Sequence, residues 1–164
     1  MGQLIRGKER IMDTVQDQVW KDMDFTGKDF TRHEFHNVKF MNCNLLGCDF
    51  RESVFDGCLF ERCTMYHCKF NDGVVVGSRF SFCDLIDSCW DTTRMSQVTF
   101  EYCNMNSSSF LDVMWIGVTF DDVDLYRGCF DWSTLADVEF NTCDLDAVDF
   151  DKVVRVRNDR EPKS

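Results

Sequence analysis

An apolar side chain returns at every fifth position through most of this sequence. Steps of five from Phe25 to Phe150 meet 26 apolar residues, with no insertion and no polar exception, and we call these residues the centres. A period of five fits neither an α-helix, whose faces repeat about every 3.6 residues, nor a plain strand, whose faces repeat every two. The chain is therefore expected to turn a corner every five residues.

A second position, two residues before each centre, is small or apolar along most of the chain. From Val38 to Val148 it holds Cys, Ser, Thr, Gly or Val, and the exceptions in the first units are Met23, Lys28 and His33. The other three positions of each unit are mostly polar, with occasional glycines where a turn can need a positive φ. The centres and the small residues are both expected to point into the interior.

Several five-residue runs resemble the pentapeptide-repeat family, in which a small residue, Asp or Asn, and Leu or Phe precede two polar positions. Cys-Asn-Leu at 43–45 and Cys-Asp-Leu at 83–85 and 143–145 show the pattern. The resemblance runs from about residue 21 to residue 151. It implies an all-β, right-handed quadrilateral β-helix with four units, or 20 residues, in each turn. The 26 units then form about 6.5 turns, or a rod about 31 Å long at about 4.8 Å per turn.

The sequence also supports a 20-residue turn by itself. All 13 centres at multiples of ten, from Phe30 to Phe150, are aromatic, but a period of ten does not separate opposite sides. Cysteine does separate them, because it recurs at steps of 20 from Cys43 to Cys143 and is interrupted only at Val123. The neighbouring position on the same side is acidic or amide in Asp24, Asn44, Asp84, Asn104, Asp124 and Asp144.

The chain is long enough for one domain, in which we expect three segments. Residues 21–151 form the β-helix, residues 1–20 cap its first turn, and residues 152–164 form a C-terminal cap and tail. A short helix is expected in the first segment because four apolar residues can share one face: Leu4, Ile11, Val15 and Val19. Three valines of the last segment can cover the final turn: Val153, Val154 and Val156.

The formal net charge of -11 makes direct binding to nucleic acid or to an anionic membrane unfavourable. No apolar run is long enough to cross a bilayer, and the first residues lack the apolar stretch of a signal peptide. We therefore expect a cytoplasmic protein, in which the ten cysteines are free thiols that act as small hydrophobic residues. No CxxC pair occurs, so no metal and no cofactor are expected.

Negative charge concentrates between residues 112 and 151, where eleven acidic residues meet one basic residue, Arg127. On a coil these acids fall on more than one side and make an acidic cylinder. One interpretation is a solubilising surface, and the other is a mimic of the regularly charged DNA duplex. The acidic residues are Asp112, Asp121, Asp122, Asp124, Asp131, Asp137, Glu139, Asp144, Asp146, Asp149 and Asp151.

Apolar side chains are also expected on the outside of the rod. A column one turn apart follows the centres at Leu46, Tyr66, Ile86 and Tyr126. Phe82 and Tyr102 are expected near the same corner, and Trp132 is a further outward residue. Aromatic residues outside a packed core commonly anchor interfaces, although flanking turns can also cover them. Both interpretations of this apolar corner stay open.

No catalytic set is visible in the sequence. The three histidines, His33, His36 and His67, lie in the first turns, and no nucleophile, base and orienting residue can be assembled around them. Abundant Asp and Ser side chains are expected to bond nearby backbone at turns. We therefore expect a binding protein and not an enzyme.

The family resemblance implies a partner. Quinolone-resistance and peptide-toxin immunity proteins of this kind occupy the DNA-binding saddle of gyrase, which suggests a DNA-mimicking modulator of gyrase or another type II topoisomerase. Such relatives often carry projecting loops and a C-terminal helix that joins two rods. This chain has no insertion and a short tail, and a homodimer through its C-terminal end stays open. The alternative function is a scaffold that binds another protein through the apolar corner.

Overall fold

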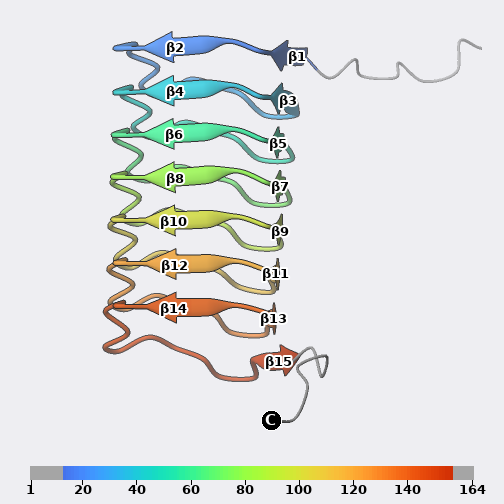
Figure 1. Ribbon diagram of the computed structural model, residues 1–164, viewed down its shortest axis with the longest axis vertical. Coiled ribbons are helices and arrows are strands. Elements are labelled where there is room, and N and C mark those ends of the chain that lie inside the picture. The colour runs from blue at the N-terminus through green and yellow to red at the C-terminus, as the bar shows by residue number, and fades with distance from the viewer. Residues whose placement is uncertain (1–12, 157–164) are drawn as a thin grey trace, which may run out of the picture.

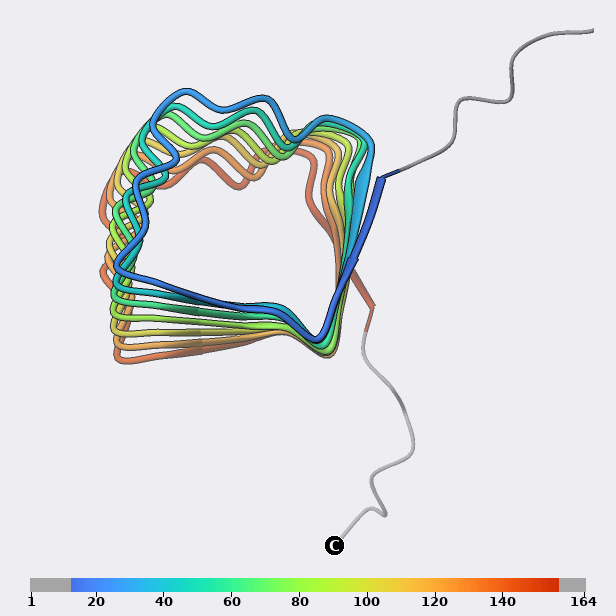
Figure 2. The same ribbon diagram turned by 90° about the horizontal axis from the view of Figure 1, so that it is seen from above.

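The computed structural model describes residues 13–156, which form a rod of stacked turns. Figure 1 shows the turns one below another, and Figure 2, seen down the rod, shows them superposed in a four-sided outline. The rod is all-β, as predicted from the sequence, and has about seven turns instead of the expected 6.5. The described residues contain no helix, and therefore none that could span a membrane.

Two parallel sheets form two sides of the rod. The eight-stranded sheet contains β1 (Asp13–Gln16), β3 (His33–His36), β5 (Val54–Asp56), β7 (Val74–Val76), β9 (Arg94–Ser96), β11 (Met114–Ile116), β13 (Thr134–Ala136) and β15 (Val154–Val156). The seven-stranded sheet contains β2 (Val19–Lys21), β4 (Lys39–Met41), β6 (Leu59–Glu61), β8 (Arg79–Ser81), β10 (Thr99–Glu101), β12 (Thr119–Asp121) and β14 (Glu139–Asn141). Each residue pairs with the one 20 positions further along, as Phe40 does with Phe60.

Single β-bridges join the turns on the other two sides. One column of bridges begins with Asp24 and Asn44, and the other with Asp29 and Asp49. Both columns continue at the same 20-residue spacing down the rod. A turn therefore has four sides and 20 residues.

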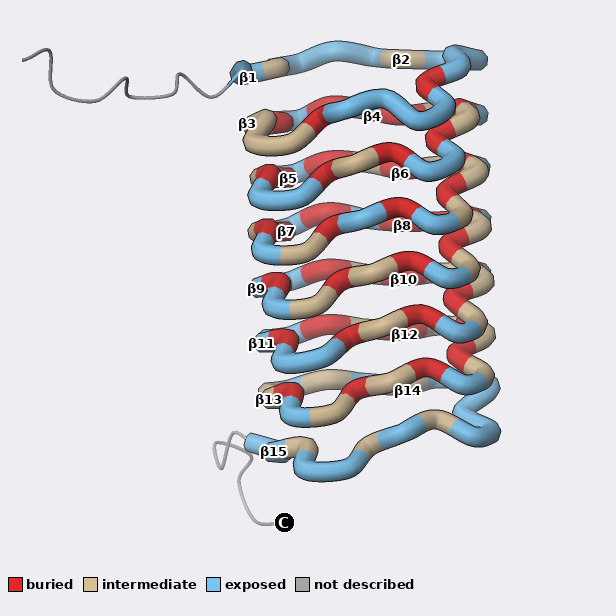
Figure 3. Tube along the Cα trace, turned by 180° about the vertical axis from the view of Figure 1, so that it is seen from behind, coloured by how far each residue is buried: buried red, intermediate tan, exposed pale blue. Residues whose placement is uncertain are grey.

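The centres and the small residues point inward and are buried through the middle of the rod. Figure 3 shows the buried positions at the same place in each turn, whereas the first and last turns are more exposed. Aromatic centres stack on one another between turns. The Phe80 ring lies between Phe60 and Phe100, with ring centroids 4.6 and 5.0 Å away. Trp90 lies 3.8 Å from Phe70 in the same manner. The interior predicted from the sequence is thus confirmed.

The small inward residues have a second role that the sequence did not reveal. The Cys48 thiol donates a hydrogen bond to the Phe25 carbonyl at 3.0 Å, and the Ser53 hydroxyl donates to the Phe30 carbonyl at 2.7 Å. The same bond, to the carbonyl 23 residues earlier, recurs at Ser133. Cys and Ser therefore fill this position both because they are small and because they satisfy a buried carbonyl of the preceding turn. All ten cysteines are free.

Every fifth residue from Asp17 to Lys152 has a left-handed backbone conformation, with φ between 52° and 65°. These residues form the corners, and five of them are glycines. Asp and Asn fill many of the others, in keeping with their tolerance of this conformation. The aromatic corner residues Phe82, Tyr102 and Trp132 are less suited to it.

The helix expected in the N-terminal cap is wrong over the described residues 13–20, which form β1 and β2 instead. Val15 pairs with Phe35, and Trp20 pairs with Phe40, so the five-residue register begins before Phe25. Hydrogen bonds to the next turn stabilise these strands, whereas a short helix has no such support. Leu4 and Ile11 lie outside the described residues. Val19 points outward and is 59% exposed.

The final turn is covered by fewer valines than expected. Val153 packs against the core and is partly buried. Val154 and Val156 belong to strand β15 and are exposed, because this strand extends the eight-stranded sheet and turns these two side chains outward. The expectation that all three valines cover the rod is therefore wrong for two of them.

Removal of an interior ring should destabilise the rod more than removal of a terminal one. Phe80→Ala is expected to lower the free energy of unfolding by about 3–5 kcal/mol, because the Phe80 ring is fully buried between two others. Phe150→Ala should lower it by less than half as much, since Phe150 is partly buried in the last turn. Urea unfolding followed by circular dichroism measures both. Equal losses for the two variants would contradict this packing.

The buried thiols predict a loss of stability at alkaline pH. Burial raises the pKa of Cys48 and Cys58 to about 11, from an ordinary value of 9.0. The unfolded chain loses these protons first, so the free energy of unfolding should fall as the pH rises from 9.0 towards about 11. The double variant Cys48→Ser/Cys58→Ser keeps the hydroxyl donor and has no thiol, so it should show a smaller fall. An equal fall in both proteins would refute this assignment.

Candidate protein-binding surface

The acidic residues between 112 and 151 lie on more than one side of the rod, as expected from the sequence. They occur in strands of the seven-stranded sheet, on the two bridged sides and at three corners, but none lies in a strand of the eight-stranded sheet. Three of them, Asp121, Asp124 and Asp131, are half-buried. The exposed acids are Asp112, Asp122, Asp137, Glu139, Asp144, Asp146, Asp149 and Asp151.

Three of these acids also hold the backbone at a corner. The carboxylates of Asp124, Asp144 and Asp149 each accept a hydrogen bond of 2.9 Å from the backbone N–H two residues later. Asp24 does the same in the first turn, where the hydroxyl of Thr26 and then its backbone N–H lower the pKa of the Asp24 carboxyl by donating to it. This role as a turn-stabilising acceptor is the one expected from the sequence. These three carboxylates serve the fold as well as the surface charge.

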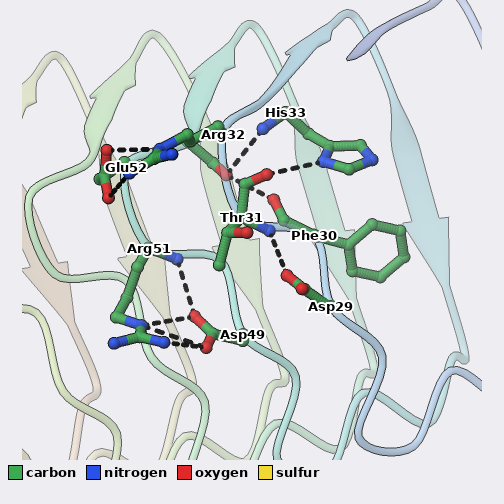
Figure 4. Close-up of polar contacts among 9 residues, drawn as sticks. Asp29, Phe30, Thr31, Arg32, His33, Asp49, Arg51 and Glu52 are labelled. Carbon is green, nitrogen blue, oxygen red and sulfur yellow. Dashed lines mark hydrogen bonds and ion pairs between the residues drawn. The ribbon is translucent and has the colours of Figure 1, made fainter. Parts of the chain in front are cut away.

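The opposite end of the rod contrasts with the acidic segment because several of its carboxylates are paired with arginine. Figure 4 shows Arg32 donating two hydrogen bonds to Glu52 of the next turn, at 2.7 and 2.8 Å, and Arg51 bound to Asp49. Between residues 112 and 151 the one basic residue, Arg127, lies over the Tyr126 ring, 5.0 Å from its centroid. The negative charge of the acidic segment is therefore offset much less by neighbouring cations.

One acidic cluster was missed by the sequence analysis. A sulfur or oxygen atom from each of Cys129, Asp131 and Asp149 lies within 4.8 Å of the others, and Asp131 Oδ1 is buried with no hydrogen-bond partner. At the equivalent place two turns earlier, Asp91 accepts hydrogen bonds from Ser109 and Leu111. The contact joins residues 18 positions apart on successive turns, a spacing that only the folded register brings together.

The apolar residues do not form one corner. Leu46, Tyr66 and Ile86 occupy the same place on three successive turns, as expected, but Asn106 separates Ile86 from Tyr126 two turns later. These four apolar residues are half-buried or slightly exposed. Phe82 and Tyr102 lie at the preceding corner, on the other edge of one bridged side. Trp132 lies at a third corner, with the Lys152 ammonium 4.6 Å from its ring centroid. The expected single corner is wrong because the chain turns two residues after each centre, which separates residue 82 from residue 86.

A stack of three side chains stands out at the corner of Phe82. The rings of Phe82 and Tyr102 are nearly parallel, with centroids 4.9 Å apart, and the Arg62 guanidinium lies 5.7 Å from the Phe82 centroid. Both residues are 52% exposed. A bulky residue in the left-handed region costs about 1–3 kcal/mol. Two aromatic residues at such corners therefore add strain and exposed apolar surface in the same place.

An open groove of about 420 Å³ lies beside this stack. The rings of Phe82 and Tyr102 form one wall, and acidic and amide side chains form much of the rest. Its polar residues are Asp84, Asn104, Asp122 and Asp124. Aromatic faces and carboxylates both attract cations, so the groove suits a positively charged group.

The histidines lie on the wall, where each faces at least one carboxylate. His33 lies 3.8 Å from Asp13, His36 lies 3.4 Å from Asp56, and His67 lies 3.9 Å from Asp87. Exposed pairs of this kind contribute little to stability.

Comparison with known proteins agrees with the repeat. The family model described as pentapeptide repeats (8 copies) matches residues 21–57 and 34–72. The same five-residue register continues in the structure to the last strand. The chain is a pentapeptide-repeat protein. Pentapeptide-repeat proteins are generally non-catalytic. No curated protein sequence matches this one.

Several solved pentapeptide-repeat structures resemble this protein at low identity. QnrB1, a plasmid-mediated fluoroquinolone resistance protein, is 20% identical with a TM-score of 0.34, over 90% of this chain and 84% of QnrB1. A protein of the Arabidopsis thaliana thylakoid lumen is 18% identical with a TM-score of 0.41, over 71% of this chain and 68% of its own. HetL, involved in heterocyst differentiation regulation in Nostoc, is 9% identical with a TM-score of 0.26, over 86% and 88%. Likenesses this low transfer no function.

The unpartnered Asp131 oxygen predicts a stabilising substitution. Asp131→Asn replaces one of two facing carboxylates with an amide that can donate, as Asn71 donates to Cys89 Sγ at 2.9 Å in an equivalent contact. The free energy of unfolding should rise by about 1 kcal/mol, and the melting temperature by about 2–4 °C. Asp91→Asn is the matched control, and it should give no increase because Asp91 is already satisfied. Destabilisation by Asp131→Asn would contradict the assignment.

Proposed function

We propose that this pentapeptide-repeat protein is a non-catalytic rod that binds another protein, and that its acidic surface takes the place of a DNA duplex in a basic groove of that partner. The observation that carries the proposal is the density of negative charge on a rigid rod. A regular filled interior supports the rod shape, and some polar residues of the outer surface stabilise turns or form ion pairs.

The charge density is comparable with that of DNA. Residues 13–156 contain 26 acidic and 12 basic residues, a formal net charge of -14. Spread over about seven turns of about 4.8 Å, this is roughly one net negative charge per 2.4 Å of rod, against about one per 1.7 Å for duplex DNA. Residues 112–151 occupy two turns and reach roughly one per ångström. A groove that binds DNA through its phosphates would attract this surface for the same reason.

DNA gyrase or another type II topoisomerase is the specific partner that we propose. The resemblance of the repeats to gyrase-binding members of the family motivates this choice, and the acidic rod supports it in this chain. No direct contact with nucleic acid or with an anionic membrane is part of the proposal, because both would be repelled. The proposed partner implies a cytoplasmic location for the protein.

A general scaffold is the second candidate function, and the exposed Phe82–Tyr102 stack favours it. The two functions differ in their response to salt. Binding through exposed charges weakens steeply as ionic strength rises, whereas binding through apolar contacts does not. Partner binding that is insensitive to salt would favour the scaffold.

A gyrase supercoiling assay, with and without ciprofloxacin, tests the proposed function. The protein is expected to inhibit supercoiling or to protect gyrase from the drug at micromolar concentration. Asp112→Asn/Asp137→Asn should weaken the effect about three- to tenfold, because two exposed charges of the acidic segment are lost.

The matched control is Asp72→Asn/Asp87→Asn, which removes the same charge from corners with the same backbone conformation outside that segment. Asparagine tolerates these corners, so all four substitutions should preserve the fold. The control should retain most of the activity. Neither inhibition nor protection by the unmodified protein would overturn the proposal.

A further inference from the structure

The geometry points to the outer face of the Tyr102 ring as a binding site for an arginine side chain of the partner, with Asp122 as its counter-ion. This inference rests on the proposed function, because it assigns a place on the rod to a basic partner. It specifies one corner of the acidic surface and one type of partner side chain. The overall charge of the rod specifies neither.

The Tyr102 ring presents one face to the chain and one to solvent. Phe82 covers the first face, with an angle of 11° between the two rings. The other face points towards the next turn, in which Asp122 occupies the same corner. The two turns are joined there, since Tyr102 N donates to the Asp121 carbonyl at 2.9 Å. A cation stacked on this face therefore lies beside the exposed Asp122 carboxylate.

The stack itself shows how a guanidinium binds here. At its other end Arg62 lies over Phe82, 5.7 Å from the ring centroid. Tyr126 and Trp132 also hold cations of the chain, Arg127 and Lys152. Within residues 13–156 no lysine or arginine lies over Tyr102. The outer face of the Tyr102 ring can therefore bind a cation, but it has none over it. The Phe82 ring at the other end of the stack has Arg62 over it.

The surroundings of this face favour a positive ligand. Asp84, Asp122 and Asp124 line the groove beside the ring. Asn104 also lines the groove and lies between Asp84 and Asp124 in one column of β-bridges. Phosphate, nucleic acid and anionic lipid are repelled by this set of carboxylates. A purely apolar ligand would leave the acids desolvated and unpaired. A planar cation can stack on the Tyr102 ring and also form ion pairs with the carboxylates.

Arginine fits this description better than lysine. Its planar guanidinium stacks parallel to an aromatic ring and presents several N–H donors at its edge, which can bind a carboxylate in two places. A lysine ammonium is a strongly hydrated point charge and stacks less well. The corner should therefore discriminate between two peptides that carry equal positive charge.

The placement of these aromatic residues is not explained by stability. Phe82 and Tyr102 have φ values of 54° and 52°, in a region that bulky residues rarely adopt, and each residue is half-exposed. The corners on either side in this column hold Arg62 and Asp122, and Asn42 lies one turn before Arg62. Asp and Asn tolerate the conformation better than an aromatic residue does. A binding role accounts for rings at this strained position, whereas folding alone favours smaller polar residues.

Fluorine NMR of the full chain labelled with 3-fluorotyrosine tests the inference. The chain has three tyrosines, so the labelled protein gives three signals, which single Tyr→Phe variants assign. The probe is the peptide acetyl-Gly-Arg-Gly-Arg-Gly-amide, and the comparison is the same peptide with lysine in place of arginine. The arginine peptide is expected to shift the Tyr102 signal most, and the lysine peptide should bind about threefold or more weakly at that signal.

Variants distinguish peptide binding at this corner from general electrostatic attraction to the acidic surface. Asp122→Asn should weaken arginine-peptide binding about tenfold. Asp72→Asn is the matched control, because it removes the same charge from a corner with a similar φ, 59°, on another edge of the rod and outside the acidic segment. It should change the affinity less than twofold. Tyr102→Asn, which suits the left-handed backbone, should abolish the preference for arginine, and Tyr102→Phe should keep it. Because these two variants lack the Tyr102 signal, their peptide affinities are measured by isothermal titration calorimetry.

Equal weakening by Asp122→Asn and Asp72→Asn, or equal shifts of all three tyrosine signals, would overturn the inference and indicate diffuse attraction. These results are independent of the gyrase assay. If the peptide binds at Tyr102 and gyrase is unaffected, the site stands and the proposed partner fails. If gyrase is inhibited equally by the protein and by its Asp122→Asn and Tyr102→Asn variants, the proposed function stands and this site fails.

Discussion

Backbone hydrogen bonds between successive turns are the interaction on which the whole rod depends. Phe25 N donates to the Asn44 carbonyl at 2.8 Å, and Asn44 N donates to the Met23 carbonyl at 2.9 Å, so each turn both gives and receives. This exchange continues only if every turn has the same number of residues. One inserted residue would shift each later centre out of the interior, as a register slip does in any sheet. The unbroken period of five is therefore a condition of the fold.

The corners and the interior leave few positions free to vary. Each unit commits its centre and its small residue to the core and its corner residue to a left-handed backbone. The outward positions and the corner side chains remain, and these carry the acidic surface and the Phe82–Tyr102 stack. The residues available for binding in such a rod are therefore those on its outer surface. The regular turns determine where each of these residues lies relative to the next.

Much of the architecture could be predicted from the sequence because the period is direct evidence of which side chains share a face. The inward positions and the 20-residue turn followed from it, and so did the carboxylates that bond backbone at corners. The N-terminal turn was missed because Val15 and Trp20 continue the register without matching the family pattern, while Val15 and Val19 are four residues apart, a spacing that also suits a helix. Edge hydrogen bonds to the next turn decide between the two, and these appear only in the folded chain.

The candidate site was harder to predict for a geometric reason. Sequence spacing placed the column of Leu46, but not the corner to which Phe82 belongs, because that depends on where within each unit the chain turns. The bonds from Cys48 and Ser53 to carbonyls 23 residues earlier, and the contact of Asp131 with Asp149, likewise join residues on successive turns. Each of these depends on offsets that are fixed only when the turns are stacked.

The claim that the acidic rod substitutes for a duplex is tested most directly by competition for one groove. A fluorescent DNA duplex bound to gyrase is titrated with the protein, and the anisotropy of the duplex is followed at increasing salt concentrations. The account predicts that the protein displaces the duplex, and that the displacement weakens steeply as salt is added. A complex in which gyrase holds the duplex and the protein together, or displacement that is unaffected by salt, would contradict it.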